Sequence, residues 1–302
     1  MPSYAYYQKK FILLEDAKMS VMTNFAHYGT GVFEGIRGNW NKEEKQLYLY
    51  RLKEHYERLM NGCRVLNIDL PYSVDDLCDL TVKLTAKCKF EEDVYVRPVA
   101  YKSSEAMGVR LHNLENDFFA FVFPWGRYLD TDRARCCVSS WRFPTEVPRA
   151  KLTGLYITNA LAKTEAVENG FDEAIMLTPN GYVAEGSGEN LFIVVDGKLI
   201  TPQASDGILV GITRDTVIKL AKNELGIETV ERHINRLELY NAAEIFMTGT
   251  AAHITPISEI DRRKIADGGI GKVTKKLQKL YADVIVGKNK KYAKWCTPVY
   301  KK

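Results

Sequence analysis

The sequence predicts an α/β protein of the α+β kind, with two domains in which mixed and antiparallel sheets pack against helices. Its 302 residues can bury two moderate cores, and this length favours about two domains. Segments with helical spacing of apolar residues alternate with short strand-like segments in both halves. Two hairpin dipeptides, Asn180-Gly181 and Asp196-Gly197, indicate antiparallel strands, so a repeated doubly wound sheet is not expected.

The first half contains short strands and two helices. Ser73-Val74-Asp75-Asp76 is an approximate capping box, and the leucines that follow it at helical spacing predict a helix. An earlier amphipathic helix is expected over 52–66. Strands are expected over 11–14, 47–50, 94–101 and 118–123.

A Pro- and Gly-containing segment over 124–132 interrupts the apolar pattern and indicates a connection between domains. We therefore expect a small N-terminal α/β domain over 1–123, an interdomain loop over 124–133, and a large C-terminal domain with a basic tail over 134–302. In the second half, strands are expected over 136–141, 173–178 and 191–195, and helices over 155–169, 213–225 and 272–286.

Composition excludes several classes of protein. The 42 Lys and Arg against 38 Asp and Glu leave a net charge of +4, too small to predict a nucleic-acid partner. Six lysines between Gly287 and Lys302 are interpreted as a solvated tail. The six cysteines lack metal-site or disulfide-framework spacing, so neither a metal nor disulfides are expected. No apolar run approaches the roughly 20 residues of a membrane helix, and we expect a cytoplasmic protein.

Lys151 and Glu185 are the first candidate site residues. Glu185 lies just before the small-residue turn Gly186-Ser187-Gly188, and Lys151 precedes an expected helix. A pyridoxal phosphate enzyme needs such a pair, because a lysine holds the cofactor aldehyde as a Schiff base and a carboxylate keeps the pyridine nitrogen protonated. Taken singly, each is also explained as a turn carboxylate or a solvated cation.

Three segments could bind phosphate. Residues 207–215 form a glycine-bounded loop entering a helix, where the amides of Ile212 and Thr213 would favour an anion, although Thr213 could simply be the N-cap. Residues 247–252 are a turn of small residues after a strand. Arg58 could clamp a phosphate or pair with Glu54 one helical turn earlier.

Tyr95 and Arg97 share one face of an apolar strand by its two-residue period. A guanidinium there needs an anionic partner, because an unpaired buried charge is unfavourable. From the strand alone, that partner is either an internal carboxylate or the carboxylate of a substrate.

Several of these motifs occur together, in the order found in branched-chain amino acid aminotransferases, and the chain resembles that family from about Phe11 to Val286. Those enzymes have the two-domain fold type IV of pyridoxal phosphate enzymes. The matching segments are 27–37, 123–129, Lys151 with Tyr156, 185–192, 211–215 and 249–252.

The resemblance implies roles for individual residues. Lys151 resembles the Schiff-base lysine, Glu185 the partner of the pyridine nitrogen, and Tyr156 the phenol that bonds the cofactor's ring oxygen. The phosphate cup would comprise Arg58, Ile212, Thr213 and Thr250. The substrate residues would be Tyr95 and Arg97, the amides at Thr250-Ala251, the apolar walls Phe33 and Tyr128, and Tyr28 and Val109 from the neighbouring subunit.

The family's activity would be transfer of an amino group between the branched-chain L-amino acids leucine, isoleucine and valine and 2-oxoglutarate. The shared site implies an obligate homodimer, with higher assembly left open. D-amino acid aminotransferases, (R)-amine transaminases and aminodeoxychorismate lyases share the lysine and glutamate, and a cofactor-binding protein without turnover is a further alternative. His253 departs from the family, in which an acidic residue is more usual after the 249–252 turn, so the substrate range is less firmly implied than the cofactor.

Overall fold

The computed structural model describes residues 2–126, 131–143 and 150–300, and it divides into two compact units. Unit 1 comprises Met1–Gly126, Ala150–Leu155 and Asp283–Lys302, and unit 2 comprises Arg127–Arg149 and Tyr156–Ala282. The α/β class with mixed and antiparallel sheets is confirmed. The units divide the chain differently from the expected boundaries, because residues 150–155 and the C-terminal segment join unit 1 through backbone pairing.

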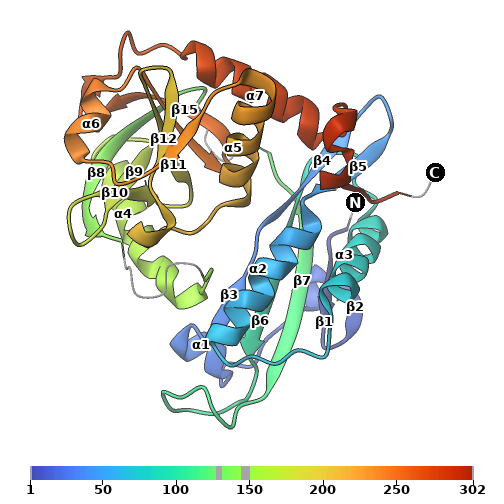
Figure 1. Cartoon of the computed structure of the whole chain (residues 1–302). Helices are drawn as coiled ribbons and strands as arrows, with labels where there is room; N and C mark the ends of the chain where they lie inside the picture. The colour runs from blue at the N-terminus through green and yellow to red at the C-terminus, as the bar shows by residue number, and fades with distance from the viewer. Residues whose placement is uncertain (1, 127–130, 144–149, 301–302) are drawn as a thin grey trace. The chain divides into compact units, whose positions relative to one another are not determined.

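Unit 1 is built on one antiparallel sheet (Figure 1). Among the described residues this sheet has eight strands in the order β17-β5-β4-β6-β7-β1-β2, with β3 paired to β6. Its strands are β1 (Tyr4–Tyr7), β2 (Lys10–Leu13), β3 (Gly31–Phe33), β4 (Ile36–Asn41), β5 (Gln46–Tyr50), β6 (Val94–Lys102), β7 (Asn116–Pro124) and β17 (Cys296–Pro298). Its helices are α1 (Asn24–Tyr28), α2 (Leu52–Val65) and α3 (Val74–Cys88), with short 3-10 turns at Leu14–Asp16, Thr153–Leu155 and Lys290–Trp295.

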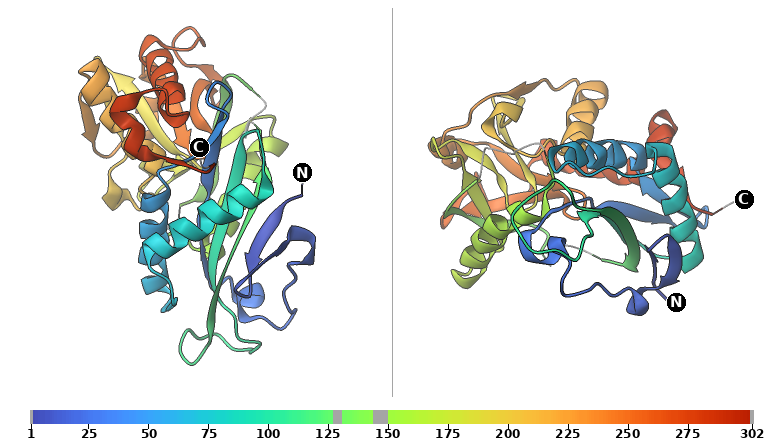
Figure 2. Two further views of the ribbon diagram at one scale, coloured as in Figure 1. Left: turned by 90° about the vertical axis from the view of Figure 1, so that its right-hand side faces the viewer. Right: turned by 90° about the horizontal axis from the view of Figure 1, so that it is seen from below.

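Helices α2 and α3 pack beside each other against the sheet of unit 1 (Figure 2). The predicted capping box is confirmed: Ser73 Oγ accepts from the Asp76 amide, and Asp76 accepts from the Ser73 amide. Leu77 and Leu84 are fully buried, as their helical spacing predicted. Because α2 lies against β3, the side chains of α2 that face the sheet meet residues that follow β3.

The expectation of a solvated C-terminal tail is wrong for residues 287–300. Strand β17 extends the sheet by pairing with β5. Gln46 holds the residues after it, donating to the Tyr300 carbonyl at 2.7 Å and accepting from the Tyr300 amide at 2.8 Å. The lysines are compatible with this docking because they extend outward, with Lys288 bound to Glu43 at 2.7 Å.

Unit 2 contains a mixed sheet, with nine strands among its described residues, in the order β10-β9-β8-β15-β14-β11-β12-β13, and with β16 paired to β15. Strand β8 runs parallel to β9 and β15, and β12 runs parallel to β13. Its strands are β8 (Ala134–Arg142), β9 (Glu173–Leu177), β10 (Val183–Gly186), β11 (Asn190–Val195), β12 (Lys198–Thr201), β13 (Thr229–Glu231), β14 (Glu244–Gly249), β15 (His253–Ile260) and β16 (Arg263–Lys264). Its helices are α4 (Tyr156–Glu168), α5 (Ile212–Leu225) and α6 (Arg236–Asn241), with a 3-10 turn at Ala204–Asp206 and the start of α7 (Lys272–Ile285).

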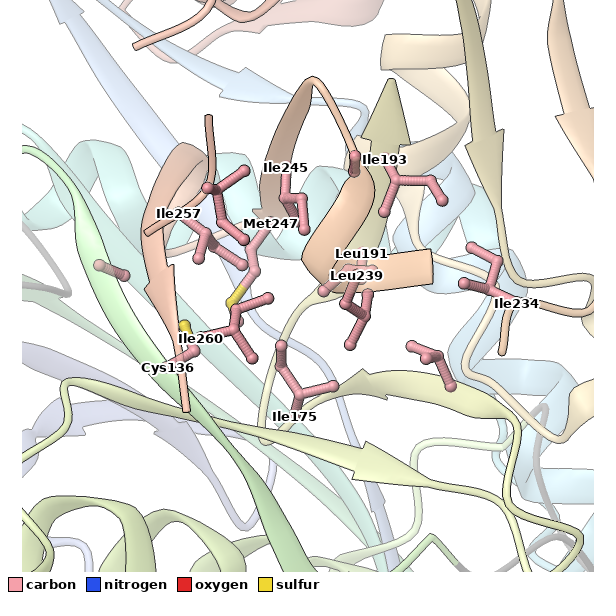
Figure 3. Close-up of a cluster of buried hydrophobic side chains, with 14 of the residues drawn as sticks. Cys136, Ile175, Leu191, Ile193, Ile234, Leu239, Ile245, Met247, Ile257 and Ile260 are labelled. Carbon is pink, nitrogen blue, oxygen red and sulfur yellow. The ribbon is translucent and has the colours of Figure 1, made fainter. Parts of the chain in front are cut away.

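Both predicted hairpins are confirmed, since β9 pairs with β10 and β11 with β12 in antiparallel fashion. The sheet of unit 2 has a core of apolar side chains that includes Leu191, Met247 and Ile260 (Figure 3). All three are fully buried. This core fixes β11 and β14, and the candidate residues Thr250 and Ala251 directly follow β14. None of the helices in the described part of the chain is long and apolar enough to cross a membrane.

Replacing Leu191 with alanine should destabilise the protein by about 2–5 kcal/mol, because the substitution leaves a cavity in a close-packed core. The matched control is Leu237→Ala in α6, whose side chain is 70% exposed. That control should change the free energy of unfolding by less than about 0.5 kcal/mol. Urea denaturation of both variants measures the difference, and equal effects would contradict the assignment of Leu191 to the core.

Candidate active site

Lys151 is held beside β3 in unit 1. Its carbonyl accepts from the Phe33 amide at 3.0 Å, and the next residue, Leu152, forms a β-bridge with Val32. The Lys151 ammonium nitrogen lies 4.8 Å from the centroid of the Phe33 ring. The lysine therefore projects from a short segment whose backbone is fastened to the sheet.

Phe33 also contacts Arg97, so one ring packs against two cationic side chains. Arg97 Cζ lies 4.7 Å from the Phe33 ring centroid, and Arg97 donates to the Tyr95 hydroxyl at 3.3 Å. This contact confirms that Tyr95 and Arg97 share a strand face. Within the described residues no carboxylate pairs with Arg97, and its buried Nε has no hydrogen-bond partner.

Glu34 is a fully buried carboxylate that the sequence reading did not single out. It accepts from Arg58 Nε at 2.6 Å and Arg58 Nη2 at 2.8 Å, and from His55 Nδ1 at 2.8 Å. Arg58 therefore pairs with Glu34, while Glu54 pairs with Arg51. The available signal was an acidic residue directly after the apolar β3 strand, since a buried charge needs a partner.

These contacts shift the pKa values of the charged groups in unit 1. Burial alone would raise the pKa of Glu34, but Arg58 and His55 hold that pKa well below its usual range. Burial lowers the pKa of His55, and it also lowers the pKa of Lys151. The positive charges of Arg58 and Arg97 lower the pKa of Lys151 further, whereas Glu34 opposes this. The Lys151 amine is therefore more readily neutral, and more nucleophilic, than that of a solvated lysine.

Glu185 lies in unit 2 on β10, and its carboxylate is held by two donors. Glu185 Oε2 accepts from Asn190 Nδ2 at 2.9 Å and from the Leu209 amide at 3.1 Å. Asn190 Nδ2 also donates to the Leu209 carbonyl at 2.7 Å. Asn190, at the start of β11, thus links Glu185 to the loop before α5. The sequence reading quoted Asn190 in its motif and gave it no role.

The loop before α5 ends in a glycine N-cap, Gly211, so Ile212 and Thr213 are the first helical residues. The interpretation of Thr213 as the N-cap is wrong. A Cβ on Gly211 would overlap Asn190 Oδ1, which explains why glycine is required there. The amides of Ile212 and Thr213 occupy the first turn of a 14-residue helix, where amides point beyond the helix end and favour an anion.

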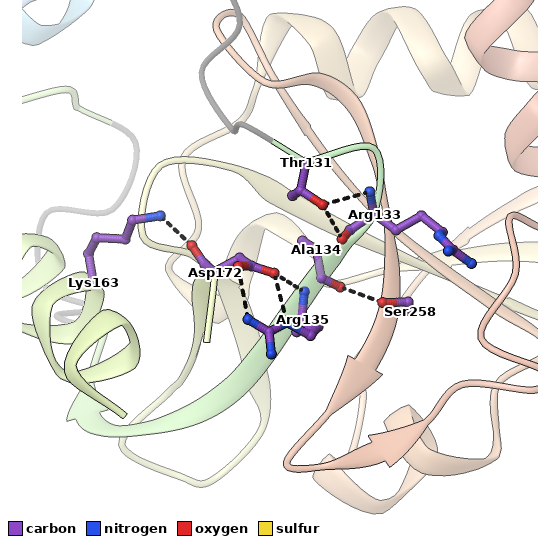
Figure 4. Close-up of polar contacts among 7 residues, drawn as sticks. All are labelled: Thr131, Arg133, Ala134, Arg135, Lys163, Asp172 and Ser258. Atoms are coloured by element: carbon purple, nitrogen blue, oxygen red, sulfur yellow. Dashed lines mark hydrogen bonds and ion pairs between the residues drawn. The ribbon is translucent and has the colours of Figure 1, made fainter. Parts of the chain in front are cut away.

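The remaining residues of unit 2 lie near turns and helix starts. Thr250 and Ala251 form the partly buried turn between β14 and β15, and Tyr156 is the first residue of α4. Helix α4 is tied to the sheet by Lys163, which donates to the Asp172 carbonyl at 2.6 Å, while the Asp172 carboxylate accepts from the Arg135 amide at 2.7 Å (Figure 4).

Tyr28 is the last residue of α1, and Val109 lies in the loop between β6 and β7, both in unit 1. The Tyr28 hydroxyl accepts from the Gly108 amide at 2.9 Å, and Val109 is 90% exposed. The structure thus brings Tyr28 and Val109 close together, and neither residue takes part in the Lys151 contacts described above. Tyr128, the expected second apolar wall, lies outside the described residues.

The family model for class IV aminotransferases matches residues 31–260. A protein of Aquifex aeolicus (strain VF5) named "Probable branched-chain-amino-acid aminotransferase" is 50% identical over 99% of this chain and 97% of its own length. The chain therefore belongs to the class IV aminotransferases.

Solved structures point to the same branch of the family. The branched-chain aminotransferase of Thermoproteus uzoniensis with norvaline is 42% identical with a TM-score of 0.94, covering 99% of both chains. The branched-chain amino acid aminotransferase of Thermobaculum terrenum in its PLP form is 38% identical with a TM-score of 0.94, again covering 99% of both chains.

Replacing Arg58 with methionine should destabilise the protein without cofactor by about 3–5 kcal/mol, because Glu34 would keep a buried charge without its main partner. The control Arg64→Met removes an exposed arginine of the same helix and should cost less than about 0.5 kcal/mol. The double variant Glu34→Gln/Arg58→Met should recover part of the loss, since the buried charge is gone.

Urea unfolding at pH 7 gives these values. The stabilisation should also weaken as the pH falls below 4.5, the ordinary pKa of Glu34, because the unfolded chain then binds a proton that the paired Glu34 of the folded protein excludes. A single variant as stable as the unchanged protein would contradict the importance of the pair.

Proposed function

We propose that this chain is a pyridoxal phosphate-dependent aminotransferase that moves an amino group between leucine, isoleucine or valine and 2-oxoglutarate. The observation that carries the proposal is the desolvated Lys151 amine, held beside Phe33 and Arg97 with a lowered pKa. A structural lysine on a surface would have neither the fixed backbone nor the neighbouring cations. The full-length similarity to branched-chain aminotransferases supports the same activity.

The residues present fit the cofactor by the chemistry of their donors. Lys151 would bind the aldehyde carbon, and Glu185, already held by Asn190, would accept from a protonated pyridine nitrogen. Arg58 and the first amides of α5 would hold the phosphate, together with Thr250, and Tyr156 would bond the ring oxygen. When bound, pyridoxal phosphate supplies an electron sink that stabilises negative charge on the substrate Cα.

Two side chains of this protein would then transfer protons and stabilise charge. Lys151 Nζ, whose pKa is lowered by burial, would act as the general base that takes the proton from the substrate Cα and as the general acid that returns it. The Glu185 carboxylate would keep the pyridine nitrogen of the cofactor protonated, because its negative charge is already held in position. We assign most of the rate acceleration to these two side chains.

Substrate recognition is assigned to two kinds of surface. Phe33 and Tyr128 would form apolar walls for the branched side chain, and the amides at Thr250-Ala251 would receive the α-carboxylate. Arg97 and Tyr95 would bind the distal carboxylate of glutamate or 2-oxoglutarate, which is supported by the unpaired Arg97 Nε.

We further infer a homodimer in which Tyr28 and Val109 reach the site of the neighbouring subunit. The 90% exposure of the apolar Val109 side chain supports this, because an exposed apolar loop residue fits an interface. The cytoplasmic location expected from the sequence remains a prediction.

The activity is tested in one cuvette. The purified protein with pyridoxal phosphate should absorb in the visible range, lose that absorbance with L-leucine, and regain it with 2-oxoglutarate. Lys151→Ala should abolish this cycle, because no other amine can replace Nζ, while the protein stays folded by circular dichroism. Lys83→Ala, an exposed lysine of α3, is the control and should retain the cycle. Normal turnover by the Lys151→Ala variant would remove the central assignment.

Arg97→Leu should impair the half-reaction with glutamate far more than the one with leucine. Loss of a charged hydrogen-bonding partner at a desolvated site costs about 2–5 kcal/mol, and leucine has no distal carboxylate. Single-turnover absorbance changes with each substrate measure the two half-reactions separately. Arg64→Leu serves as a control for the loss of an arginine. If both half-reactions slow equally, glutamate recognition cannot be assigned to Arg97.

A further inference from the structure

Glu189 is a buried carboxyl group to which the proposed reaction assigns no role. It is 4% exposed and is the last residue of the turn that begins with Glu185. Its carbonyl accepts from the Gly186 amide at 2.7 Å, and its side-chain Oε2 accepts from the Gly188 amide at 3.1 Å. The side chain thus folds back into the turn formed by residues 185–189, which we call the Glu185 turn.

Two glycines pack closely on Glu189. A Cβ added to Gly186 would lie 2.7 Å from Glu189 Oε2, so no larger residue fits without displacing the carboxyl group. A Cβ added to Gly249 would lie 3.4 Å from Glu189 Cγ and 3.3 Å from the Gly188 carbonyl. Gly249 ends β14 and leads into the Thr250-Ala251 turn. Glu189 therefore touches both turns to which unit 2's cofactor and substrate roles are assigned.

The charges around Glu189 are mostly negative. Glu173 on β9 is fully buried and is paired with Lys163 of α4 at 2.7 Å, and Glu185 lies on β10. Cys136 on β8 is a buried thiol. Burial raises its pKa, and the negative charges of Glu173 and Glu189 raise it further. His253 pairs through its backbone with Gly249, but its ring packs against Tyr281. Burial is the largest cause that raises the pKa of Glu189 to about 8, and the negative charge of Glu173 is the second. The Gly188 amide and Lys163 oppose the rise.

We propose that Glu189 is a positioning residue that, as an uncharged carboxylic acid, braces the Glu185 turn against the Gly249–Ala252 turn. The catalytic consequence of this inference rests on the proposed function. Its structural part does not. Ionisation would place a further anion near Glu173 and Glu185, inside a turn where Gly186 and Gly249 pack closely on Glu189. The neutral acid leaves Glu185 as the carboxylate to which the cofactor role is assigned. The contacts of Glu189 within the turn hold Glu185 in position.

The structural part is tested with Glu189→Gln, which keeps the size and neutrality of the acid, and with the control Glu168→Gln on the exposed face of α4. Thermal unfolding of the full-length protein is measured from pH 4 to pH 10, with and without pyridoxal phosphate. A carboxyl group whose pKa is raised on folding releases a proton on unfolding, so its stabilisation is lost as the pH rises.

Relative to Glu189→Gln, the folding equilibrium of the unchanged protein should therefore weaken about tenfold per pH unit between pH 4.5 and about pH 8, and no further above pH 8. Glu168→Gln should run parallel to the unchanged protein. Parallel curves for Glu189→Gln would overturn the proposal, because they would mean that Glu189 is ionised in the folded state.

The catalytic part is tested by turnover of the loaded enzyme. At pH 7, Glu189→Gln should have the same kcat as the unchanged protein. Between pH 7 and pH 9, the ratio of the variant's kcat to that of the unchanged protein should rise about tenfold, because only the unchanged protein has a Glu189 that ionises. Glu189→Ala should lower kcat at least about tenfold more than it raises the cofactor Kd, since the brace is lost while the phosphate ligands remain.

A Gln variant as impaired as the Ala variant at pH 7, or an Ala variant with full kcat, would overturn the positioning role. If the Ala variant does not fold, the pH dependence of the Gln variant decides. Absence of transamination in the unchanged protein would overturn the proposed function alone, because the unfolding curves do not depend on turnover.

Discussion

The buried ion pair between Glu34 and Arg58 is the interaction on which the Lys151 surroundings depend. Glu34 follows β3, the strand that carries Phe33 and is fastened to Lys151, and Arg58 lies on α2, which packs against β3. A guanidinium with a fixed carboxylate partner has a fixed direction, because the planar bidentate geometry leaves little rotation. One pair thus sets both where a positive charge lies near Lys151 and how α2 is oriented on the sheet.

The two units hold opposite excesses of charge. In the described part of unit 1, the cations Arg58 and Arg97 and the amine of Lys151 outnumber the anion Glu34 beside them. In the described part of unit 2, the carboxyl groups of Glu173, Glu185 and Glu189 outnumber the cation Lys163 near the Glu185 turn. In a medium of low dielectric constant such groups cannot all keep ordinary ionisation, so a neutral amine on one side and a neutral acid on the other relieve the imbalance. An anionic group would be stabilised near the first, and a protonated ring nitrogen near the second.

The sequence predicted the regular elements well and the contacts poorly, for physical reasons. Helices over 52–66 and 213–225 follow from local periodicity, and the Asn180-Gly181 and Asp196-Gly197 hairpins follow from turn chemistry, since both signals involve neighbouring residues. The role of Glu34 depends on Arg58, which is separated from it by two strands and part of a helix. Local spacing therefore suggested Glu54 as the partner, whereas burial of Glu34 decided the pairing. The side chain of Thr213 left an N-cap open as an alternative, whereas in the structure Gly211 is the N-cap and a Cβ at residue 211 would overlap Asn190.

The docking of the C-terminal segment affects how the protein folds during synthesis. Strand β17, at residues 296–298, forms the edge of the unit 1 sheet by pairing with β5, at residues 46–50. All of unit 2 is translated between these two strands, so the edge of unit 1 closes only after residues 296–298 have been synthesised. Until then β5 presents an unpaired edge, which is where strands of other chains can add. Unit 1 is therefore the part that needs protection on the ribosome, although it is the first to be made.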